Sequence, residues 1–295
     1  MPDWRALAGD IQQVSGLDLN TDSLSPVTGG CINKAWRVDS GEGPVFVKTN
    51  ESGFLGMFQA EADGLTELAA AHGVRVPRPL ACGVSGAEAW LVLEWIEQGR
   101  PKPDSDSVLG EGLARQHRCS AESFGWVRDN NIGSTPQENS QTNDWPAFFA
   151  SQRLGFQLDL IEVGGCAGRL VPAGRRLAEE VPVLLAGHSP QPALLHGDLW
   201  GGNWFCDSQG RPCIFDPAVY YGDREADIAM THLFGGFGAE FYSAYASSWP
   251  LEPGSQARID LYNLYHVLNH VNLFGARYAD QAETMIGRLL AQLSA

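Results

Sequence analysis

The sequence predicts an α+β chain of two lobes, in which a small antiparallel sheet with one key helix precedes a larger, mainly helical part. Strand-like alternation dominates the start of the chain, whereas helical spacing of apolar residues dominates the rest. A connector rich in Pro, Ser and Asp, GRPKPDSDS, follows the change in pattern. The 295 residues also suit two lobes around a cleft, because single cores stop growing near about 250–300 residues. We therefore expect lobes over residues 1–97 and 98–295.

The first lobe is expected to open with a helix over residues 3–15, where apolar side chains recur at helical spacing. A three-strand meander follows between 24 and 50, with paired glycines at one corner. The helix expected over 54–72 presents one apolar face. Two more strands complete the predicted sheet, at 80–84 and 88–96.

Beyond the connector the pattern is mostly helical. Helices are expected at 107–119, 144–163, 169–186, 225–234, 238–248, 255–274 and 277–293. The later strand signals lie at 193–196, 203–206 and 211–215. The second lobe is therefore predicted to be helical, with a short hairpin that carries its most distinctive motif.

Charge and composition exclude several classes of protein. The net charge is -15 and the few basic residues are scattered, which argues against a nucleic-acid partner. No apolar run approaches the roughly 20 residues of a membrane span, and the first residues have no signal-peptide core. The six cysteines lie far apart with no CxxC pair, which favours free thiols. We expect a cytoplasmic protein without a membrane partner.

The stretch HGDLWGGNW, residues 196–204, is the strongest motif. It places Asp198 five positions before Asn203, and a strand-like run then leads to Asp216, thirteen residues later. This spacing is typical of the catalytic loop of kinase-fold phosphotransferases. Asp198 would accept the proton of the attacking hydroxyl, while Asn203 and Asp216 would bind Mg²⁺ under the ATP phosphates. The alternative is a solvated turn.

A lysine and a glutamate upstream complete the pattern. Lys48 ends the alternating run PVFVK, from which it could reach a cleft and neutralise ATP phosphates. Glu61, in the middle of the next predicted helix, could pair with it. The alternative is that both are surface charges.

The corner VTGGCINKAW could cover the phosphates. Gly29, Gly30 and Cys31 would offer backbone N–H groups there, because no large side chain blocks them. Cys31 could also act as a redox switch, although a passive cysteine is the stronger alternative.

The segment between the lobes, Glu94-Trp95-Ile96-Glu97, is the expected adenine site. Main-chain groups would make the contacts there, so the side chains are only weakly diagnostic.

Four further residues have less specific signals. His196 is expected to pack and hydrogen-bond beneath the loop. Asp227 could cap its helix or brace the catalytic-loop backbone. His266 and His270 stand four apart on a predicted helix, where packing or a substrate cleft outweighs metal binding.

Two departures from protein kinases favour a small acceptor. Gly197 stands where a regulated protein kinase has an arginine, and Pro217-Ala218 follows Asp216 in place of Phe-Gly. No Ala-Pro-Glu follows, so neither a phosphorylation-gated loop nor a peptide platform is expected.

The segments HGDLWGGNW, FDPAVYYGDREADIAMTHLFGGF and LYNLYHVLNHVNLFG together resemble the fructosamine kinase (ketosamine-3-kinase) family, which is related to aminoglycoside phosphotransferases and choline kinases. GGCIN, VFVK, FQAEADGL, LVLEWIE and FGWVRDNNIGSTPQ also look like family segments, so the resemblance covers nearly the whole chain. It implies a protein-kinase-like fold and ATP-dependent phosphorylation of the C3 hydroxyl of ketoamines such as ribulosamines, erythrulosamines or fructosamines. The resulting 3-phosphate is unstable and releases the amine.

The resemblance carries the roles of Lys48, Glu61, Asp198, Asn203 and Asp216 and the adenine contact at 94–97 onto this chain. For the sugar, aromatic faces at Trp200, Tyr220 and Tyr221 are candidates, with core packing an equal alternative.

Several alternatives stay open. Another small-molecule kinase of this fold, with an aminoglycoside, choline or homoserine acceptor, would share the motifs, and so would a nucleotide-binding pseudokinase. Glycated protein lysines are possible substrates, and the chain is expected to be a monomer or a homodimer.

Overall fold

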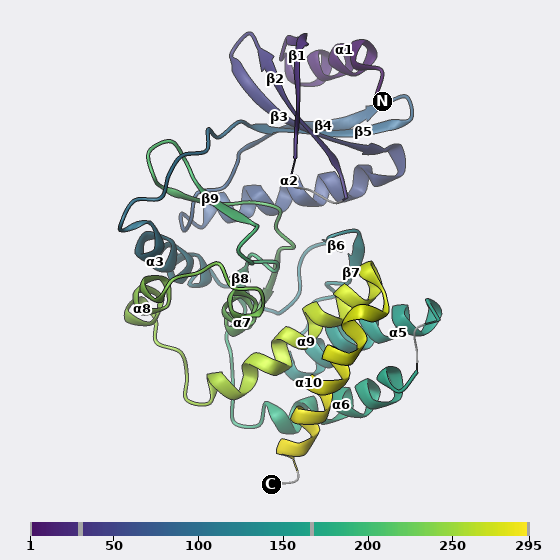
Figure 1. The fold of residues 1–295 in the computed structure, drawn as a ribbon, viewed down its shortest axis with the longest axis vertical. Helices are drawn as coiled ribbons and strands as arrows, with labels where there is room; N and C mark the ends of the chain where they lie inside the picture. Colours follow the sequence, from purple (N-terminus) through teal and green to yellow (C-terminus); the bar gives the residue numbers. More distant parts are fainter. Residues whose placement is uncertain (1, 29–31, 166–167, 294–295) are drawn as a thin grey trace.

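The N-terminal part is a five-stranded antiparallel sheet in the order β1-β2-β3-β5-β4 (Figure 1). The structure is a computed structural model and describes residues 2–28, 32–165 and 168–293. The strands are β1 (Leu19–Val27), β2 (Lys34–Ser40), β3 (Gly43–Glu51), β4 (Pro79–Ser85) and β5 (Glu88–Glu94). β1 begins earlier than predicted, because its polar first half has no alternation and its register with β2 shifts after Asn20. The expected sheet is otherwise confirmed.

Helix α1 (Trp4–Ser15) covers one face of this sheet. The Asp3 side chain accepts hydrogen bonds from the first-turn amides, and Gly16 ends the helix at φ 78°, a conformation that favours glycine. Leu7 and Ile11 of α1 pack in one cluster with sheet residues such as Val47. Among the described residues, this outer cluster contains none that follows β5 in the sequence.

Helix α2 (Leu55–Ala70) covers the opposite face. Its buried Phe58 and Leu65 share a cluster with Leu91 and Leu93, which alternate along β5 with the residues of the outer cluster. The same cluster continues into the helical part of the chain, so α2 packs on both the sheet and the helices.

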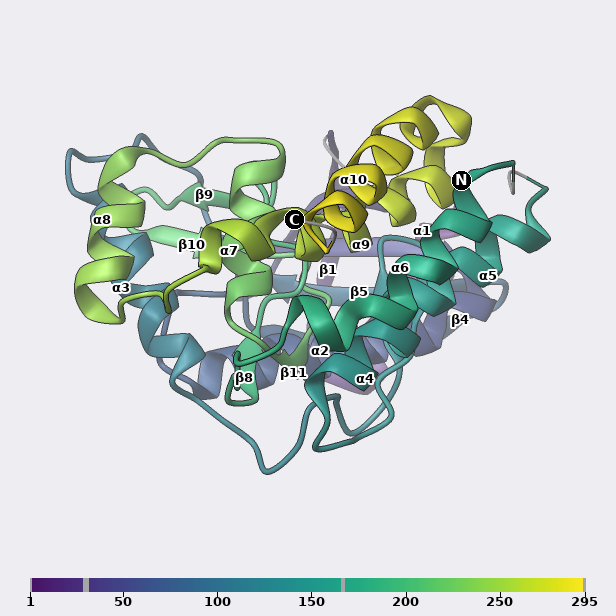
Figure 2. The same ribbon diagram turned by 90° about the horizontal axis from the view of Figure 1, so that it is seen from below.

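The remaining helices confirm the predicted mainly helical lobe. Figure 2 shows α3 and α8 at one end of the molecule and α5, α6, α9 and α10 at the other. Their bounds are α3 (Ser105–His117), α4 (Trp145–Phe148), α5 (Phe156–Val163), α6 (Leu170–Leu184), α7 (Glu225–Leu233), α8 (Ala239–Ser248), α9 (Ser255–Phe274) and α10 (Ala279–Gln292). Among the described residues, no helix combines the length and apolarity that crossing a bilayer requires.

The helix predicted over 144–163 is not uniform. A π-helical segment, Phe149–Gly155, separates α4 from α5. Such segments are rare and often occur near functional sites. Short 3₁₀ turns also precede α2 and α10, at Ser52–Phe54 and Ala276–Tyr278.

Three two-stranded ladders connect the helices. Their strands are β6 (Asn130–Ile132) with β7 (Thr135–Gln137), β8 (Ala193–Leu195) with β11 (Tyr220–Gly222), and β9 (Trp204–Cys206) with β10 (Pro212–Ile214). Sequence reasoning found β8, β9 and β10 but missed β6, β7 and β11. Three-residue strands are too short to show alternation, so only those flanked by a recognisable motif were predictable.

Candidate active site

A cavity of about 470 Å³ brings together residues from distant parts of the sequence. Strand β3, helix α2 and the β6–β7 hairpin line one part of it, the loops after β8 and β10 another, and helices α7 and α9 the rest. The predicted site residues that line it are Lys48, Glu61, Asp198, Trp200, Asn203 and Asp216.

The register of β3 directs Lys48 toward the cavity. Val45 and Val47 lie in the outer cluster beneath α1, so the alternate residues Phe46 and Lys48 face α2. On α2, Glu61 lies three residues after the buried Phe58, on the face turned to the sheet. A buried strand lysine and a buried helix carboxylate therefore meet.

Lys48 forms two ion pairs at once. Its Nζ lies 2.6 Å from Glu61 Oε1 and 2.5 Å from Asp216 Oδ1. The Lys48 and Glu61 side chains are buried, whereas that of Asp216 is 43% exposed in the cavity. Burial alone would disfavour the ammonium, but Asp216 and Glu61 outweigh it and raise the pKa of Lys48 above its ordinary value. The lysine is therefore a fixed positive charge.

The loop between β8 and β9 holds Asp198 and Asn203 close together. Asn203 Nδ2 donates to the Asp198 backbone carbonyl at 2.8 Å and to Asp198 Oδ2 at 3.2 Å. The Asn203 backbone amide donates to the carbonyl of Trp200, which closes the turn. These bonds orient the carboxylate of Asp198 and turn the amide oxygen of Asn203 away from it.

Position 197 requires glycine because its backbone lies very close to the backbone of Ala218. Its φ is 82°, and a Cβ at this position would lie 2.0 Å from the carbonyl oxygen of Ala218. The backbone amide of Ala218 in turn donates to His196 O at 2.8 Å. The loop that carries Asp198 is thus packed directly on the chain that follows Asp216, and no side chain fits between them.

Asp227 braces the catalytic loop and does not cap its own helix. Its carboxylate accepts hydrogen bonds from the backbone amides of His196, at 2.7 Å, and Gly197, at 2.8 Å, and from His117 Nε2 at 3.1 Å. Burial would raise the pKa of Asp227, but these donors hold it below its ordinary value. Of the two roles that the sequence left open, the structure shows the brace.

His196 packs beneath the loop, as predicted. Its Nε2 lies 3.0 Å from the carbonyl oxygen of Phe215, and the backbone amide of Asp198 donates to its Nδ1 at 3.3 Å. Burial lowers its pKa, so the ring stays neutral. A neutral ring that donates from Nε2 and accepts at Nδ1 joins the two loops of the site.

The surroundings of Asp198 raise the pKa of its carboxyl group toward neutral pH. Burial raises its pKa to about 7; Asp216 and Asp227 add to this effect, and the hydrogen bond from Asn203 opposes it. A base with a pKa near the working pH is well matched to proton transfer.

The site suits Mg²⁺ bound with a nucleotide phosphate. Asn203 and Asp216 offer an amide oxygen and a carboxylate, and oxygen ligands are those that Mg²⁺ prefers. Asp216 also has a positive φ of 54°, which a non-glycine residue adopts only when its surroundings hold it there. The donor set and the strained backbone both fit a metal-binding residue.

Aromatic side chains form the other wall of the cavity. This aromatic wall consists of Trp200, Phe234, His270, Phe274 and Tyr278, whose neighbouring ring centroids lie 5.0 to 6.2 Å apart. Sequence reasoning identified Trp200 and left a cleft role open for His270, but missed the other three. Phe234 and Phe274 each precede a glycine at a helix end, which resembles an ordinary helix stop, and Tyr278 has no distinctive signal.

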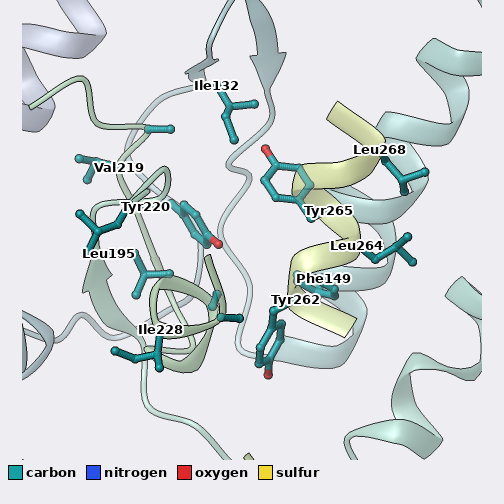
Figure 3. Packing of buried hydrophobic residues seen from close by; sticks show 14 of the residues in the cluster. Ile132, Phe149, Leu195, Val219, Tyr220, Ile228, Tyr262, Leu264, Tyr265 and Leu268 are labelled. Atoms are coloured by element: carbon teal, nitrogen blue, oxygen red, sulfur yellow. The ribbon is translucent and has the colours of Figure 1, made fainter. Parts of the chain in front are cut away.

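The structure corrects the sugar-flanking role expected of Tyr220 and Tyr221, since neither lines the cavity. Tyr220 is 2% exposed, and its ring lies over the guanidinium of Arg153. Figure 3 shows it turned into the core near Leu195. Tyr221 donates its hydroxyl to Glu67 on α2. Adjacent strand residues point to opposite faces, and here neither face opens on the cavity.

For two groups of predicted residues the structure shows no place in this cavity, the first because it is not described. Gly29, Gly30 and Cys31 fall outside the described residues; Ile32 and Asn33, which follow them, line the cavity. The cavity lining does not include residues 94–97. The side chain of Glu94 pairs with Arg75 at 2.7 Å, and the indole of Trp95 donates to Glu97. The adenine contact stays a prediction for the main chain.

The two helical histidines differ. His266 is buried, which lowers its pKa to about 3 and keeps the ring neutral within the packing of α9. His270 lies in the aromatic wall, and its Nδ1 donates to the carbonyl of His266 at 2.7 Å.

Comparison with known proteins gives a consistent result. The model of the fructosamine kinase family matches residues 3–292. A "Probable ketoamine kinase" of Synechocystis sp. is 47% identical over 288 residues, 97% of each chain. A chloroplastic protein-ribulosamine 3-kinase of Oryza sativa subsp. indica is 41% identical over 295 residues, 99% of this chain and 84% of the rice protein. A crystal structure named "Putative fructosamine-3-kinase", from Haemophilus somnus, is similar with a TM-score of 0.88 and 29% identity over 97% of both chains.

Proposed function

The chain belongs to the fructosamine kinase family, and we propose that it transfers the γ-phosphoryl group of ATP to the C3 hydroxyl of a ketoamine. A ketoamine is a sugar joined through C1 to an amine. The 3-phosphate that forms is unstable and releases the amine, so the reaction repairs glycated amines. The observation that carries this proposal is one cavity that has the Lys48, Glu61 and Asp216 ion cluster at one wall and the aromatic wall at the other.

The phosphate side of the cavity, here the name for Lys48, Glu61, Asp198, Asn203 and Asp216, supports phosphoryl transfer by positioning and charge. Mg²⁺, held by Asn203 and Asp216, would neutralise the charge on the ATP phosphates when bound. Lys48 supplies a permanent positive charge, and Glu61 keeps its ammonium from moving away. Asp198 orients the acceptor hydroxyl and takes its proton late, as a loose transition state requires.

The acceptor side suits a sugar joined to an amine. Aromatic rings present apolar faces to the C–H groups of a sugar, and they attract a protonated amine through cation–π contacts. Trp200 lies two residues from Asp198 on the same loop, so a sugar against its ring has a hydroxyl near the base. We therefore assign the aromatic wall to the ketoamine.

Glycated protein lysines are included in the proposed substrates. Trp200, Phe234 and Phe274 remain about 40% exposed, so the aromatic wall reaches the protein surface. A sugar on a protein lysine could therefore enter while the protein stays outside.

A cytoplasmic location is also part of the proposal. The cysteines in the described part of the chain are free thiols, as is usual in the cytoplasm: Cys82, Cys119, Cys206 and Cys213.

The test is ADP release with a panel of acceptors. Ribulosyl-, erythrulosyl- and fructosyl-amines are compared with choline and an aminoglycoside, and the position of the new phosphate is determined by NMR. We expect turnover with ketoamines and phosphate on C3. Turnover with choline or the aminoglycoside alone would contradict the proposed acceptor, and phosphate at another hydroxyl would contradict the proposed position.

A further inference from the structure

Residues 124–139, here called the bracing segment, connect two parts of the phosphate side that are distant in sequence. The segment begins at Phe124, includes the β6–β7 hairpin and ends at Asn139. Asn130, Asn131 and Gly133 of the segment line the cavity. Other side chains of the segment bind α2, which carries Glu61, and the backbone that follows Asp216.

The first connection, here called the Glu67 clamp, consists of Glu67, Trp126 and Tyr221. Glu67 lies on α2, six residues after Glu61. One oxygen of its carboxylate accepts the indole N–H of Trp126 at 2.5 Å, and the other accepts the hydroxyl of Tyr221 at 2.7 Å. Hydrogen bonds to an ionised group are stronger than neutral ones, so both contacts hold α2 effectively.

The surroundings of the Glu67 clamp favour a fixed geometry. Burial and the nearby Glu67 raise the pKa of Tyr221, so its phenol keeps the proton that it donates. Gly125 and Tyr221 exchange two backbone hydrogen bonds, which tie the bracing segment to β11. On α2, a Cβ at Gly64 would lie 2.9 Å from a methyl carbon of Val219, so the helix packs closely on the chain after Asp216.

The second connection, here called the amide clamp, consists of Asn130, Gln137 and Asn139. Gln137 Nε2 donates to the carbonyl of Ala218 at 3.1 Å, and Asn130 Nδ2 donates to that of Val219 at 2.8 Å. Asn130 Oδ1 accepts from both Gln137 and Asn139, each at 2.8 Å. All three side chains are buried, so these bonds are protected from water.

Two residues from other elements fix the amide clamp in turn. Tyr265 of α9 donates its hydroxyl to Gln137 Oε1 at 2.6 Å. Arg153, in the π-helical segment, donates to Asn139 Oδ1 at 2.7 Å and lies 4.0 Å from the centre of the Tyr220 ring. Arg153 is fully buried, and it also donates to the backbone carbonyls of Glu138 and Gln152. Figure 3 shows Tyr220 and Tyr265 on facing elements of this core.

The two residues that the amide clamp holds follow a strained position. Asp216 has a positive φ, and Ala218 lies against Gly197 of the catalytic loop. Without bonds to the carbonyls of Ala218 and Val219, the backbone could relax to a more common conformation. The carboxylate of Asp216 would then leave its place beside Lys48.

We propose that the bracing segment is a positioning element of the phosphotransfer site, in which the Glu67 clamp holds α2 and the amide clamp holds the backbone after Asp216. It does permanently what a phosphorylated loop does in a regulated protein kinase. This inference rests on the proposed phosphotransfer function, but its structural part can be measured without any acceptor.

The Glu67 clamp is tested by Trp126→Phe, which removes the indole N–H and leaves a smaller aromatic ring, and by Tyr221→Phe, which removes the hydroxyl and keeps the ring. Trp145→Phe is the matched control, because its indole N–H also makes a buried hydrogen bond, but to Tyr262 of α9 and not to α2. For the two clamp variants we expect kcat to fall about tenfold while the KM for the ketoamine stays within twofold. The control should keep its kcat within twofold.

Hydrogen exchange of the free protein, followed by mass spectrometry, supplies a readout without substrate. Amides of α2 should exchange about tenfold faster in Trp126→Phe and Tyr221→Phe than in Trp145→Phe, while those of α9 should match wild type in the two clamp variants. Equal losses of activity in all three variants, with no change specific to α2, would overturn the Glu67 clamp.

The amide clamp is tested by Gln137→Met, which keeps the side-chain length and removes the bonds to Ala218 and Asn130. Tyr265→Phe is the milder variant, because it removes one bond to Gln137 and leaves the others. We expect faster exchange at residues 214–219 in both, with the larger change in Gln137→Met. The affinity for Mg-ADP, measured by calorimetry, should fall about tenfold in Gln137→Met. Unchanged exchange and unchanged affinity in this variant would overturn the amide clamp.

The outcomes separate this inference from the proposed function. A wild-type protein that binds Mg-ADP but phosphorylates no ketoamine would contradict the acceptor, and the exchange and affinity measurements would still test the bracing segment. Normal ketoamine turnover in Trp126→Phe, Tyr221→Phe and Gln137→Met would contradict the bracing segment alone.

Discussion

The two walls of the cavity are built in opposite ways. The phosphate side consists of charged residues that neutralise one another, as Lys48 does with Glu61 and Asp216, and buried hydrogen bonds support each of them. The aromatic wall consists of rings, with the guanidinium of Arg277 over Phe274 and Tyr278, and three of its residues are about 40% exposed. The comparison indicates that the wall proposed for phosphoryl transfer is held by buried bonds, whereas the wall proposed for the acceptor is more open.

The largest expected effect is on the phosphate side. Asp198→Asn keeps the shape of the side chain but removes the group that takes the proton. We expect kcat to fall by about 10³-fold, within the range typical of a lost general base, with little change in the affinity for Mg-ATP. Steady-state kinetics and calorimetry measure the two quantities. A variant with unchanged kcat would show that Asp198 is not the base.

A smaller effect is expected from Glu61→Gln, which leaves Lys48 paired with Asp216 alone. Loss of one buried, charge-assisted hydrogen bond should lower kcat/KM for ATP by about 10- to 100-fold. Glu51→Gln makes the same chemical change at an exposed position at the end of β3 and should have no effect. If the two variants behave alike, the ion pair does not position the lysine.

On the aromatic wall, Trp200→Ala should act on the acceptor alone. Removal of a ring in contact with the sugar and the amine should raise the KM for the ketoamine by about tenfold. The KM for ATP, measured in the same assays, is the internal control and should stay within twofold. Equal increases in both KM values would mean that the variant disturbs the catalytic loop as a whole.

The smallest expected effect is a pH dependence that arises at His270. Burial lowers its pKa below the ordinary value of 6.5 and Arg277 lowers it further, while the hydrogen bond to the His266 carbonyl opposes this. The ring is therefore neutral at pH 7 and gains a proton only below pH 6.5. A protonated ring repels the cationic amine, so the KM for the ketoamine should rise about threefold as the pH falls below 6. The rise should be absent in His270→Gln, and a profile identical to wild type would assign it to another group.

The difference between the walls also explains what the sequence could predict. Lys48, Asp198, Asn203 and Asp216 follow from spacing, because the chemistry demands those residue types in that order along strands and turns. Trp200 was found because it lies within the same motif. Phe234 and Phe274 lie at helix ends, where an aromatic residue before a glycine signals only a helix stop, and Tyr278 lies in the short turn before α10. Their meeting at one wall depends on how α7 and α9 pack, which no local pattern records.

The family resemblance marked residues 124–137 of the bracing segment, but local patterns predicted neither its strands nor its role. β6 and β7 have three residues each, and their asparagine and glutamine side chains read as loop composition. For Tyr220 and Tyr221, the sequence could not decide between sugar contact and core packing for the same reason. A strand pattern gives two faces, but only the packing against Arg153 and Glu67 shows that both faces are covered.

The position of α2 in the larger hydrophobic cluster determines how the protein should unfold. A fragment that ends near residue 97 would keep the sheet and α1 but would leave the apolar side chains of α2 without their partners in the helical part. Such a fragment should aggregate instead of folding, and the whole chain should melt in one cooperative transition. We therefore expect the two lobes that the sequence suggests to unfold as one unit, because α2 packs on both.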